Sequence, residues 1–127
     1  IKLATRLNEQ RSENLTPLNV CVQVNIDDES SKGGVAPDSL NDLIEQIREL
    51  PRLRLRGLMA LPAPAADFST QRTAFAAVKQ LQRRLNTRRN IELDTLSMGT
   101  SADFRAAIAE QATIIRIGTA LFGPRNG

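Results

Sequence analysis

The chain has 127 residues, of which 41% are hydrophobic and 24% are charged, a balance typical of one globular domain. No apolar run reaches the roughly 18 residues of a membrane span, and no signal-peptide pattern opens the sequence. A single cysteine excludes an internal disulfide, and the absence of histidine excludes Ser-His-Asp triads and most zinc sites. We therefore expect a cytoplasmic protein, with Cys21 as a buried core thiol rather than a nucleophile.

The net charge is +3 and comes mainly from arginine, with 14 Arg against 3 Lys. Arg83, Arg84, Arg88 and Arg89 form a cluster late in a predicted helix. A nucleic-acid-binding patch is one interpretation of this cluster. All four aromatic residues are Phe, so few rings could stack on bases, and cations also suit a helix C-terminus. We favour a solvent-exposed helix face.

The first half of the chain predicts a helix, a strand and a second helix. Residues 1–8 resemble the end of a helix, and the alternating, β-branched run 18–26 predicts a strand. Residues 38–50 predict an amphipathic helix, because apolar side chains recur there at spacings of three and four. These side chains are Leu40, Leu43, Ile44, Ile47 and Leu50.

A second strand and a long helix follow. Alternation over 52–61 predicts a strand with one apolar face, made by Leu53, Leu55, Gly57, Met59 and Leu61. Ser69 is the predicted cap of the next helix. That helix carries an apolar stripe of Phe75, Val78, Leu81 and Leu85.

The last part of the chain predicts two more strands, at 93–98 and 113–117. Ser101 is expected to begin a short helix between them, and 118–123 to form a short helical piece. Alternating helices and strands imply an α/β fold with a parallel sheet. Four such units fit a small open sheet or half of a (β/α)8 barrel, and the half barrel would expose two strand edges.

Glycine stands beside hydroxyl residues where each of the last two predicted strands ends. Gly99 and Gly118 would let the backbone approach a ligand closely. Backbone N–H groups at a helix start attract anions, and Ser97, Ser101 and Thr119 would add hydroxyl donors. From spacing alone, phosphate binding and plain helix capping remain equal alternatives.

Arg116 places a charge inside the apolar run of the last predicted strand. Buried arginine is rare without a partner, so an internal ion pair is one interpretation. The other is an anion or a ring nitrogen near the strand end. Arginine facing the pyridine nitrogen is one way in which proteins tune pyridoxal phosphate.

Four segments of the chain, in order, resemble the pyridoxal phosphate homeostasis proteins, the YggS/PROSC group. They are VQVNIDDESSKGG, LRLRGLMAL, LSMGTSADFRAAI and IIRIGTALFG, and the likeness extends over essentially all 127 residues. The resemblance implies the C-terminal half of a (β/α)8 TIM barrel similar to the N-terminal domain of alanine racemase. Residues 1–127 would then form one domain that lacks the N-terminal strands of a barrel that binds pyridoxal 5′-phosphate (PLP).

The resemblance also implies the residues of a cofactor site. Ser97, Gly99, Ser101, Gly118 and Thr119 match the family's phosphate-binding loops, and Arg116 matches its arginine at the pyridine nitrogen. An arginine there should keep that nitrogen unprotonated and weaken the ring as an electron sink. No metal site is implied. The expected function is intracellular PLP (vitamin B6) homeostasis by a non-catalytic carrier or buffer; the alternative is a PLP-dependent enzyme similar to an amino-acid racemase.

Two departures from the family pattern stand out. Thr100 replaces a second methionine in the family's Ser-Met-Gly-Met-Ser loop, which adds a hydroxyl and removes a packing group. The family's Schiff-base lysine lies on the first barrel strand, and Lys2, Lys32 and Lys79 do not match it. We expect that lysine in a missing N-terminal half. That half, or a second copy of the chain, would cover the exposed sheet edges, and no nucleic-acid or membrane partner is expected.

Overall fold

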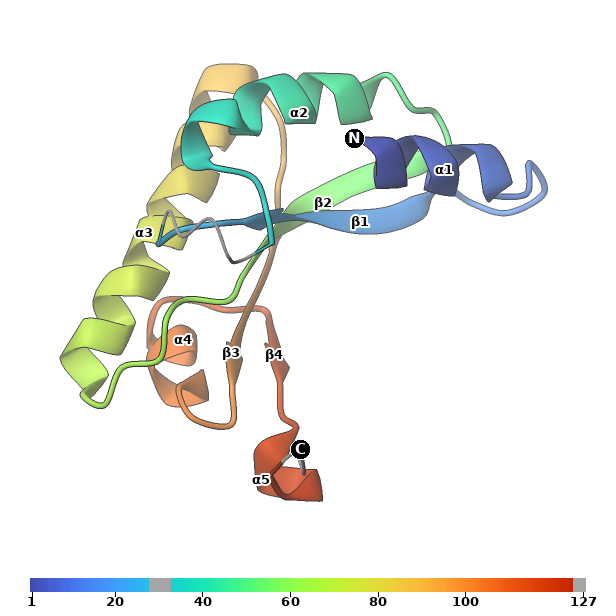
Figure 1. Cartoon of the computed structure of the whole chain (residues 1–127). Coiled ribbons are helices and arrows are strands. Elements are labelled where there is room, and N and C mark those ends of the chain that lie inside the picture. Colours follow the sequence, from blue (N-terminus) through green and yellow to red (C-terminus); the bar gives the residue numbers. More distant parts are fainter. Residues whose placement is uncertain (28–32, 125–127) are drawn as a thin grey trace.

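Helices and strands alternate along the chain in the predicted order (Figure 1). The structure is a computed structural model that describes residues 1–27 and 33–124. Its elements are α1 (Lys2–Gln10), β1 (Leu18–Val24), the 3-10 helix η1 (Pro37–Ser39), α2 (Leu40–Arg48), β2 (Leu53–Ala60), α3 (Phe68–Arg89), β3 (Thr95–Thr100), α4 (Phe104–Ala109), β4 (Ile114–Arg116) and α5 (Thr119–Phe122). The predicted α/β class is confirmed.

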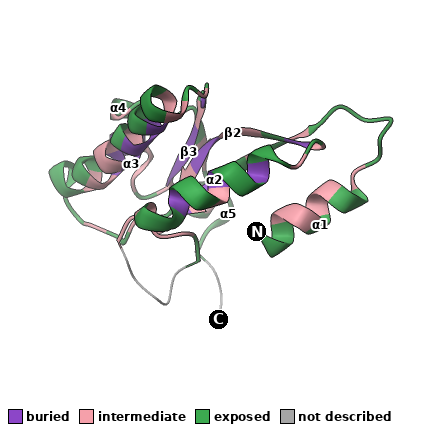
Figure 2. Cartoon of the chain, turned by 90° about the horizontal axis from the view of Figure 1, so that it is seen from above, coloured by how far each residue is buried: buried purple, intermediate pink, exposed green. Residues whose placement is uncertain are grey.

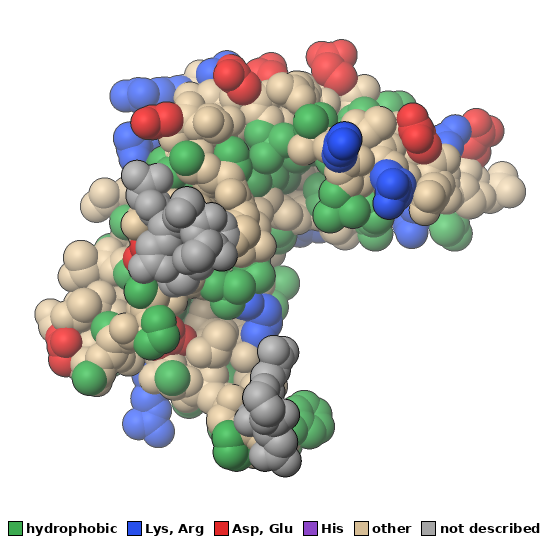
Figure 3. Space-filling model, viewed as in Figure 1, with side chains coloured by type: hydrophobic (Ala, Val, Ile, Leu, Met, Phe, Trp, Pro, Cys, Tyr) green, Lys and Arg blue, Asp and Glu red, His purple; other side chains and the backbone are tan. Residues whose placement is uncertain are grey.

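The four strands form one parallel sheet in the order β1-β2-β3-β4. Helices α2, α3 and α4 follow one side of this sheet, and α5 projects beyond the end of β4 (Figure 1). The space-filling view shows a broad hollow between the α1 end and the α5 end of the molecule (Figure 3). The sheet is therefore covered by helices on one face and open on the other.

The hydrophobic core lies between the sheet and its helices, where the buried stripes of α2 and α3 face the strands (Figure 2). Its largest fully buried side chains are Phe75, Leu40, Ile44, Leu58, Leu96, Met98, Val24 and Val78. Burial of each large apolar side chain contributes about 1.5–3 kcal/mol. Both predicted helical stripes face this core, so their periodicity located the covered face correctly.

A β-bulge interrupts the pairing of β1 with β2. Val20 pairs with Leu55, but the next residue of β1, Cys21, pairs with Gly57. Arg56 is therefore an extra residue in β2 that has no counterpart in β1. An extra residue in one strand reverses which side chains point to each face beyond it.

The bulge makes the predicted apolar face of 52–61 wrong beyond its middle. Leu58 and Ala60, which the alternation assigned to the opposite face, are fully buried under the helices. Met59 is only partly buried, and Leu61 is 41% exposed. A regular alternation in sequence therefore corresponds to two halves of β2, and the choice of odd- or even-numbered side chains that face the core changes between them.

The prediction that Cys21 is a core thiol is also wrong, because this residue is solvent-exposed. Its neighbour Val22 and the following Val24 are buried against the helices. Successive side chains of a strand point to opposite faces, so Cys21 points away from the core that Val22 and Val24 enter.

The long helix α3 begins earlier than predicted and has a different cap. Its first residue is Phe68, and its N-cap is Asp67 instead of Ser69. The Oδ2 atom of Asp67 accepts hydrogen bonds from the backbone N–H and the hydroxyl of Thr70, both at 2.8 Å. These bonds hold the pKa of Asp67 below its usual value.

The third strand and the helix after it are displaced toward the C-terminus. The strand predicted at 93–98 spans Thr95–Thr100, so Gly99 lies within it. The helix expected to begin at Ser101 begins at Phe104. A three-residue turn separates strand from helix, because the backbone N–H of Asp103 donates to the carbonyl of Thr100 at 3.2 Å.

The arginine cluster near the end of α3 faces solvent, as favoured from sequence. Arg83, Arg84 and Arg88 are exposed, and Arg89 approaches Glu45 at 3.5 Å. Across the described residues, no helix combines the length and apolar character that crossing a membrane requires.

Candidate functional site

The carboxyl ends of β3 and β4 lie side by side and border a cavity of about 660 Å³. Ser97 pairs with Ile114 and Thr100 pairs with Arg116 in the two parallel strands. The cavity is lined by Thr100, Ser101, Ala102, Arg116, Gly118, Thr119, Ala120, Phe122 and Gly123. The fold therefore brings four of the six predicted site residues to one cavity.

The other two predicted residues, Ser97 and Gly99, do not line this cavity. Ser97 lies within β3 and is only 9% exposed. Gly99 borders a separate space of about 100 Å³ next to the loop between β2 and α3. Both residues lie within β3, the strand that leads to the cavity.

The two glycines of the predicted site differ in how closely other atoms surround them. Gly99 has a φ of +103°, and a Cβ atom added there would lie 2.7 Å from the Cβ of Ala107 in α4. This glycine is required by its backbone conformation and by the close approach of α4. At Gly118, in contrast, an added Cβ would meet no atom within 4 Å. The backbone there faces open space.

Ser101 connects the loop after β3 to the turn after β4. Its Oγ atom accepts a hydrogen bond from the backbone N–H of Ala120 at 2.8 Å and another from that of Gly118 at 3.2 Å. The segments joined in this way are 17 or more residues apart in sequence. The sequence suggested Ser101 as a helix cap or a ligand; this bridging contact has no local sequence signal.

The additional hydroxyl of Thr100 is directed to a neighbouring carboxylate. Both the backbone N–H and the hydroxyl of Thr100 donate to Oδ1 of Asp103, at 2.7 and 3.2 Å. The threonine that replaces the family methionine therefore stabilises its own loop and does not present its proton to the cavity.

Arg116 reaches across the sheet from β4. Its Nη2 group donates to the carbonyl of Ala60 at 2.9 Å and lies 3.5 Å from the carbonyl of Ser97. Its Nε atom is buried and has no hydrogen-bond partner, and no carboxylate of the described residues lies within 4.0 Å of the guanidinium. The internal ion pair considered from sequence is thus not found in this part of the chain.

Partial burial lowers the pKa of Arg116, and the charge of Asp103 opposes that effect. A guanidinium nevertheless stays protonated in proteins and has donors but no acceptor. Arg116 therefore brings a positive charge without a direct ion-pair partner among the described residues, and an N–H donor without an acceptor, to the carboxyl end of the sheet. These properties suit an anion or a hydrogen-bond acceptor.

From the sequence, the carboxylates Asp27, Asp28 and Glu29 after β1 are expected to form a solvated acidic turn rather than a metal site. Asp27 Oδ2 accepts the backbone N–H of Ala63 at 2.6 Å, which ties this turn to the loop after β2. Asp28, Glu29 and Lys32 lie outside the described residues.

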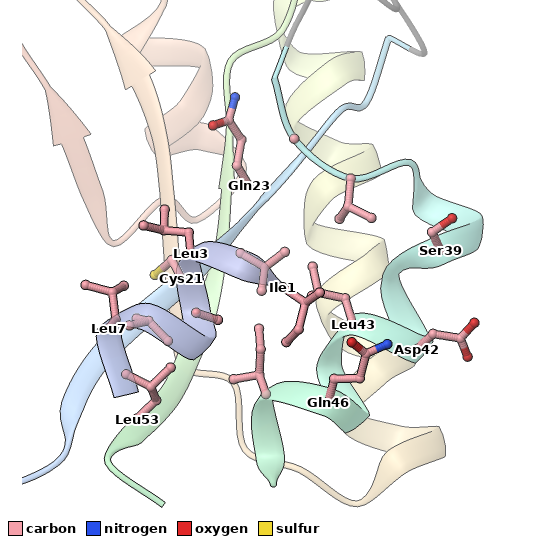
Figure 4. A pocket seen from close by; sticks show the side chains of 16 residues that line it. Ile1, Leu3, Leu7, Cys21, Gln23, Ser39, Asp42, Leu43, Gln46 and Leu53 are labelled. Atoms are coloured by element: carbon pink, nitrogen blue, oxygen red, sulfur yellow. The ribbon is translucent and has the colours of Figure 1, made fainter. Parts of the chain in front are cut away.

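A second cavity, of about 640 Å³, lies between α1, β1 and α2 (Figure 4). Aliphatic side chains from the three elements converge on it, among them Leu3, Leu43 and Leu53. Few ionisable groups border it, chiefly Cys21 and Asp42. No motif in the sequence predicted this cavity, because it arises where α1, β1 and α2 come together.

Comparison with known proteins identifies the family of the chain. Residues 1–126 match the family model described as alanine racemase, N-terminal domain. The chain belongs to that family.

Individual relatives of the chain carry a more specific name than the family model. The chain is 55% identical over 126 residues to the pyridoxal phosphate homeostasis protein of Pseudomonas aeruginosa and 48% identical over 133 residues to that of Escherichia coli K12. It covers 53% of each, so it spans about half the length of the curated relatives it matches. The resemblance predicted from the four sequence segments is confirmed.

A solved structure has a similar fold. PipY of Synechococcus elongatus, determined with PLP bound, superposes with a TM-score of 0.81 and 31% sequence identity. The superposition covers 96% of this chain and 57% of PipY.

Proposed function

We propose that this chain forms the phosphate-binding part of a PLP homeostasis protein. The carrying observation is the 660 Å³ cavity between two Gly-and-hydroxyl loops, with Arg116, whose buried Nε has no hydrogen-bond partner, among its lining residues. Support comes from relatives named pyridoxal phosphate homeostasis protein and from PipY, which was solved with PLP. On this proposal the four parallel strands are the C-terminal half of a (β/α)8 barrel, whose ligand sites lie at the carboxyl ends of the strands.

The residues at the cavity fit a phosphorylated pyridine. Ser101 and Thr119 carry hydroxyls on its wall, and the open backbone at Gly118 leaves room for phosphate oxygens. Ser97 and Gly99 support the loop from below and do not provide the main contacts. This assignment narrows the six residues expected from sequence to four that can touch the cofactor, the fourth being Arg116.

Arg116 would face the ring nitrogen or another acceptor of the cofactor. A guanidinium can only donate, so a pyridine nitrogen hydrogen-bonded to it remains unprotonated. When bound, PLP supplies an aldehyde and an electron-accepting ring, and an unprotonated ring accepts electrons less strongly. This arrangement favours holding the cofactor over carbanion chemistry.

We infer that the protein is a non-catalytic carrier or buffer of PLP. The only charged side chain that lines the cavity in the described residues belongs to Arg116, which cannot exchange a proton near neutral pH. A racemase-like enzyme would need an acid or base poised over the cofactor. In this part of the chain the lining offers none, so that alternative would depend on groups from elsewhere.

We propose that a segment equivalent to the other half of the curated relatives covers the open sheet face. Apolar side chains are exposed at the β4 end, with Leu121 71% and Phe122 81% exposed, and Ile1 and Leu3 at the other end are 51% and 69% exposed. A second copy of the chain is the alternative cover.

The lone thiol of Cys21 suits a reducing cytoplasm, where we place the protein.

Replacing Arg116 tests the proposal. Arg116→Met keeps much of the side-chain length and removes the charge, and we expect PLP affinity to fall about 10- to 100-fold, as for loss of a charged hydrogen bond. Phosphorus NMR and absorbance titrations with PLP measure the change. Arg105→Met is the control, because Arg105 is exposed and outside the cavity lining. Equal affinity in Arg116→Met and the wild type, or no PLP binding by the wild type, would contradict the proposal.

A further inference from the structure

Ser101 uses its full capacity to accept hydrogen bonds on the backbone of another loop. A serine hydroxyl has two acceptor lone pairs and one proton. The N–H groups of Ala120 and Gly118 occupy both lone pairs, at 2.8 and 3.2 Å. The only remaining capacity of the Ser101 hydroxyl is its proton, and this residue lines the 660 Å³ cavity.

The loop that carries Ser101 is itself fixed on its other side. Thr100, the preceding residue, donates twice to Asp103, and a backbone bond from Asp103 to the Thr100 carbonyl closes the same turn. Ser101 therefore projects from a braced turn. The braced turn can transmit its position to the segment 118–120. The carbonyls of Gly118 and Thr119 accept bonds from within the same short helical segment, and no atom lies within 4 Å of an added Cβ at Gly118.

We propose that Ser101 is a positioning residue that sets the separation of the two phosphate loops before any anion binds. Its Oγ atom holds 118–120 at a fixed distance from the end of β3, and its remaining proton is left to donate to the ligand. Thr119 lies between the two amides that Ser101 holds, so the orientation of the Thr119 hydroxyl depends on Ser101. This inference rests on the proposed function only for the identity of the ligand.

The first test needs no ligand. In Ser101→Ala, we expect amide hydrogen exchange at Gly118 and Ala120 to become several-fold faster and their amide resonances to shift, because both lose their acceptor. Ser101→Thr keeps the hydroxyl and should restore slow exchange. Ser69→Ala, an exposed serine at the start of α3, is the matched control. Unchanged exchange at both amides in Ser101→Ala would overturn the proposal.

The second test uses inorganic phosphate as the probe and a double-mutant cycle. We expect Ser101→Ala and Thr119→Ala each to weaken phosphate binding, with the double variant little weaker than Ser101→Ala alone, because Thr119 depends on Ser101 for its position. Fully additive effects would mean two independent ligands and would overturn the positioning role. If wild-type resonances of 97–101 and 118–120 do not respond to phosphate or to PLP, the proposed function fails, whereas the exchange result still decides the role of Ser101.

Discussion

Two cavities of nearly equal volume, about 660 and 640 Å³, occupy opposite ends of this small sheet. The first gathers hydroxyls, open backbone and a guanidinium with an unused donor at the ends of β3 and β4. The second is mostly aliphatic and lies where α1 rests beside β1 (Figure 4). Volume alone does not identify a ligand site; converging polar groups with unfilled hydrogen-bonding capacity do.

The largest expected effect concerns the backbone that builds the polar cavity. Gly99→Ala should lower the free energy of unfolding by roughly 2–4 kcal/mol, because it adds strain at positive φ and a clash with α4. Gly118→Ala should change it by less than about 0.5 kcal/mol, since open space surrounds that position. Chemical denaturation without ligand measures both. Equal losses would mean that the two loops are equally constrained, contrary to the structure.

An intermediate effect is expected at the apolar cavity. Leu43 is partly buried and packs against the core, so Leu43→Ala should cost roughly 1–2 kcal/mol of stability, less than a fully buried leucine. PLP affinity should not change, because the polar cavity is built by other elements. Ile44→Ala, at a fully buried neighbour, should cost more. A drop in PLP affinity in folded Leu43→Ala would show that the cavities are coupled.

The smallest effect is expected at an ion pair that lines neither of the two cavities. Arg56 and Asp94 form two hydrogen bonds, at 2.9 and 2.6 Å, which lower the pKa of Asp94 to about 2. The folded pKa lies below the unfolded value of about 3.9, so the stabilisation is present above about pH 4 and is lost as pH falls toward 2. The effect is small because the pair is solvent-exposed.

Comparing the pH dependence of unfolding for the wild type and Asp94→Asn between pH 5 and 2 measures this contribution. The variant should lose less stability on acidification. Identical slopes would show that the pair contributes nothing. The guanidinium of Arg116 stays protonated between pH 5 and 2, so the polar cavity should keep its positive charge over this range.

Element order and the core-facing helical stripes could be predicted from the sequence because both depend on local periodicity. The bulge at Arg56 could not, since it exists only in the pairing of β2 with β1. Because the sequence does not reveal the bulge, the alternation predicted that Met59 faces the core and that Leu58 does not. The exposure of Cys21 was missed for a related reason: an apolar run does not reveal which sheet face the helices cover.

The candidate site also has features that could be predicted from the sequence and features that could not. Motif spacing located Ser101, Gly118 and Thr119, which the parallel sheet brings to one cavity. The steric reason for Gly99 depends on α4, and the bridge made by Ser101 depends on a segment 17 or more residues away. Such contacts are tertiary and leave no pattern within the motif.

The extra residue in β2 also matters for protein engineering. Upstream of Arg56 the odd-numbered side chains of β2 face the helices, and downstream the even-numbered side chains do. The inward and outward alternation is therefore shifted by one residue between the two halves of the strand. Anyone who transplants this strand into a chimaera, or aligns it with a straight strand without a gap, must carry the insertion along. Otherwise the carbonyl of Ala60, which accepts a hydrogen bond from Arg116, moves by one place, and the end of the sheet beside the polar cavity is rebuilt.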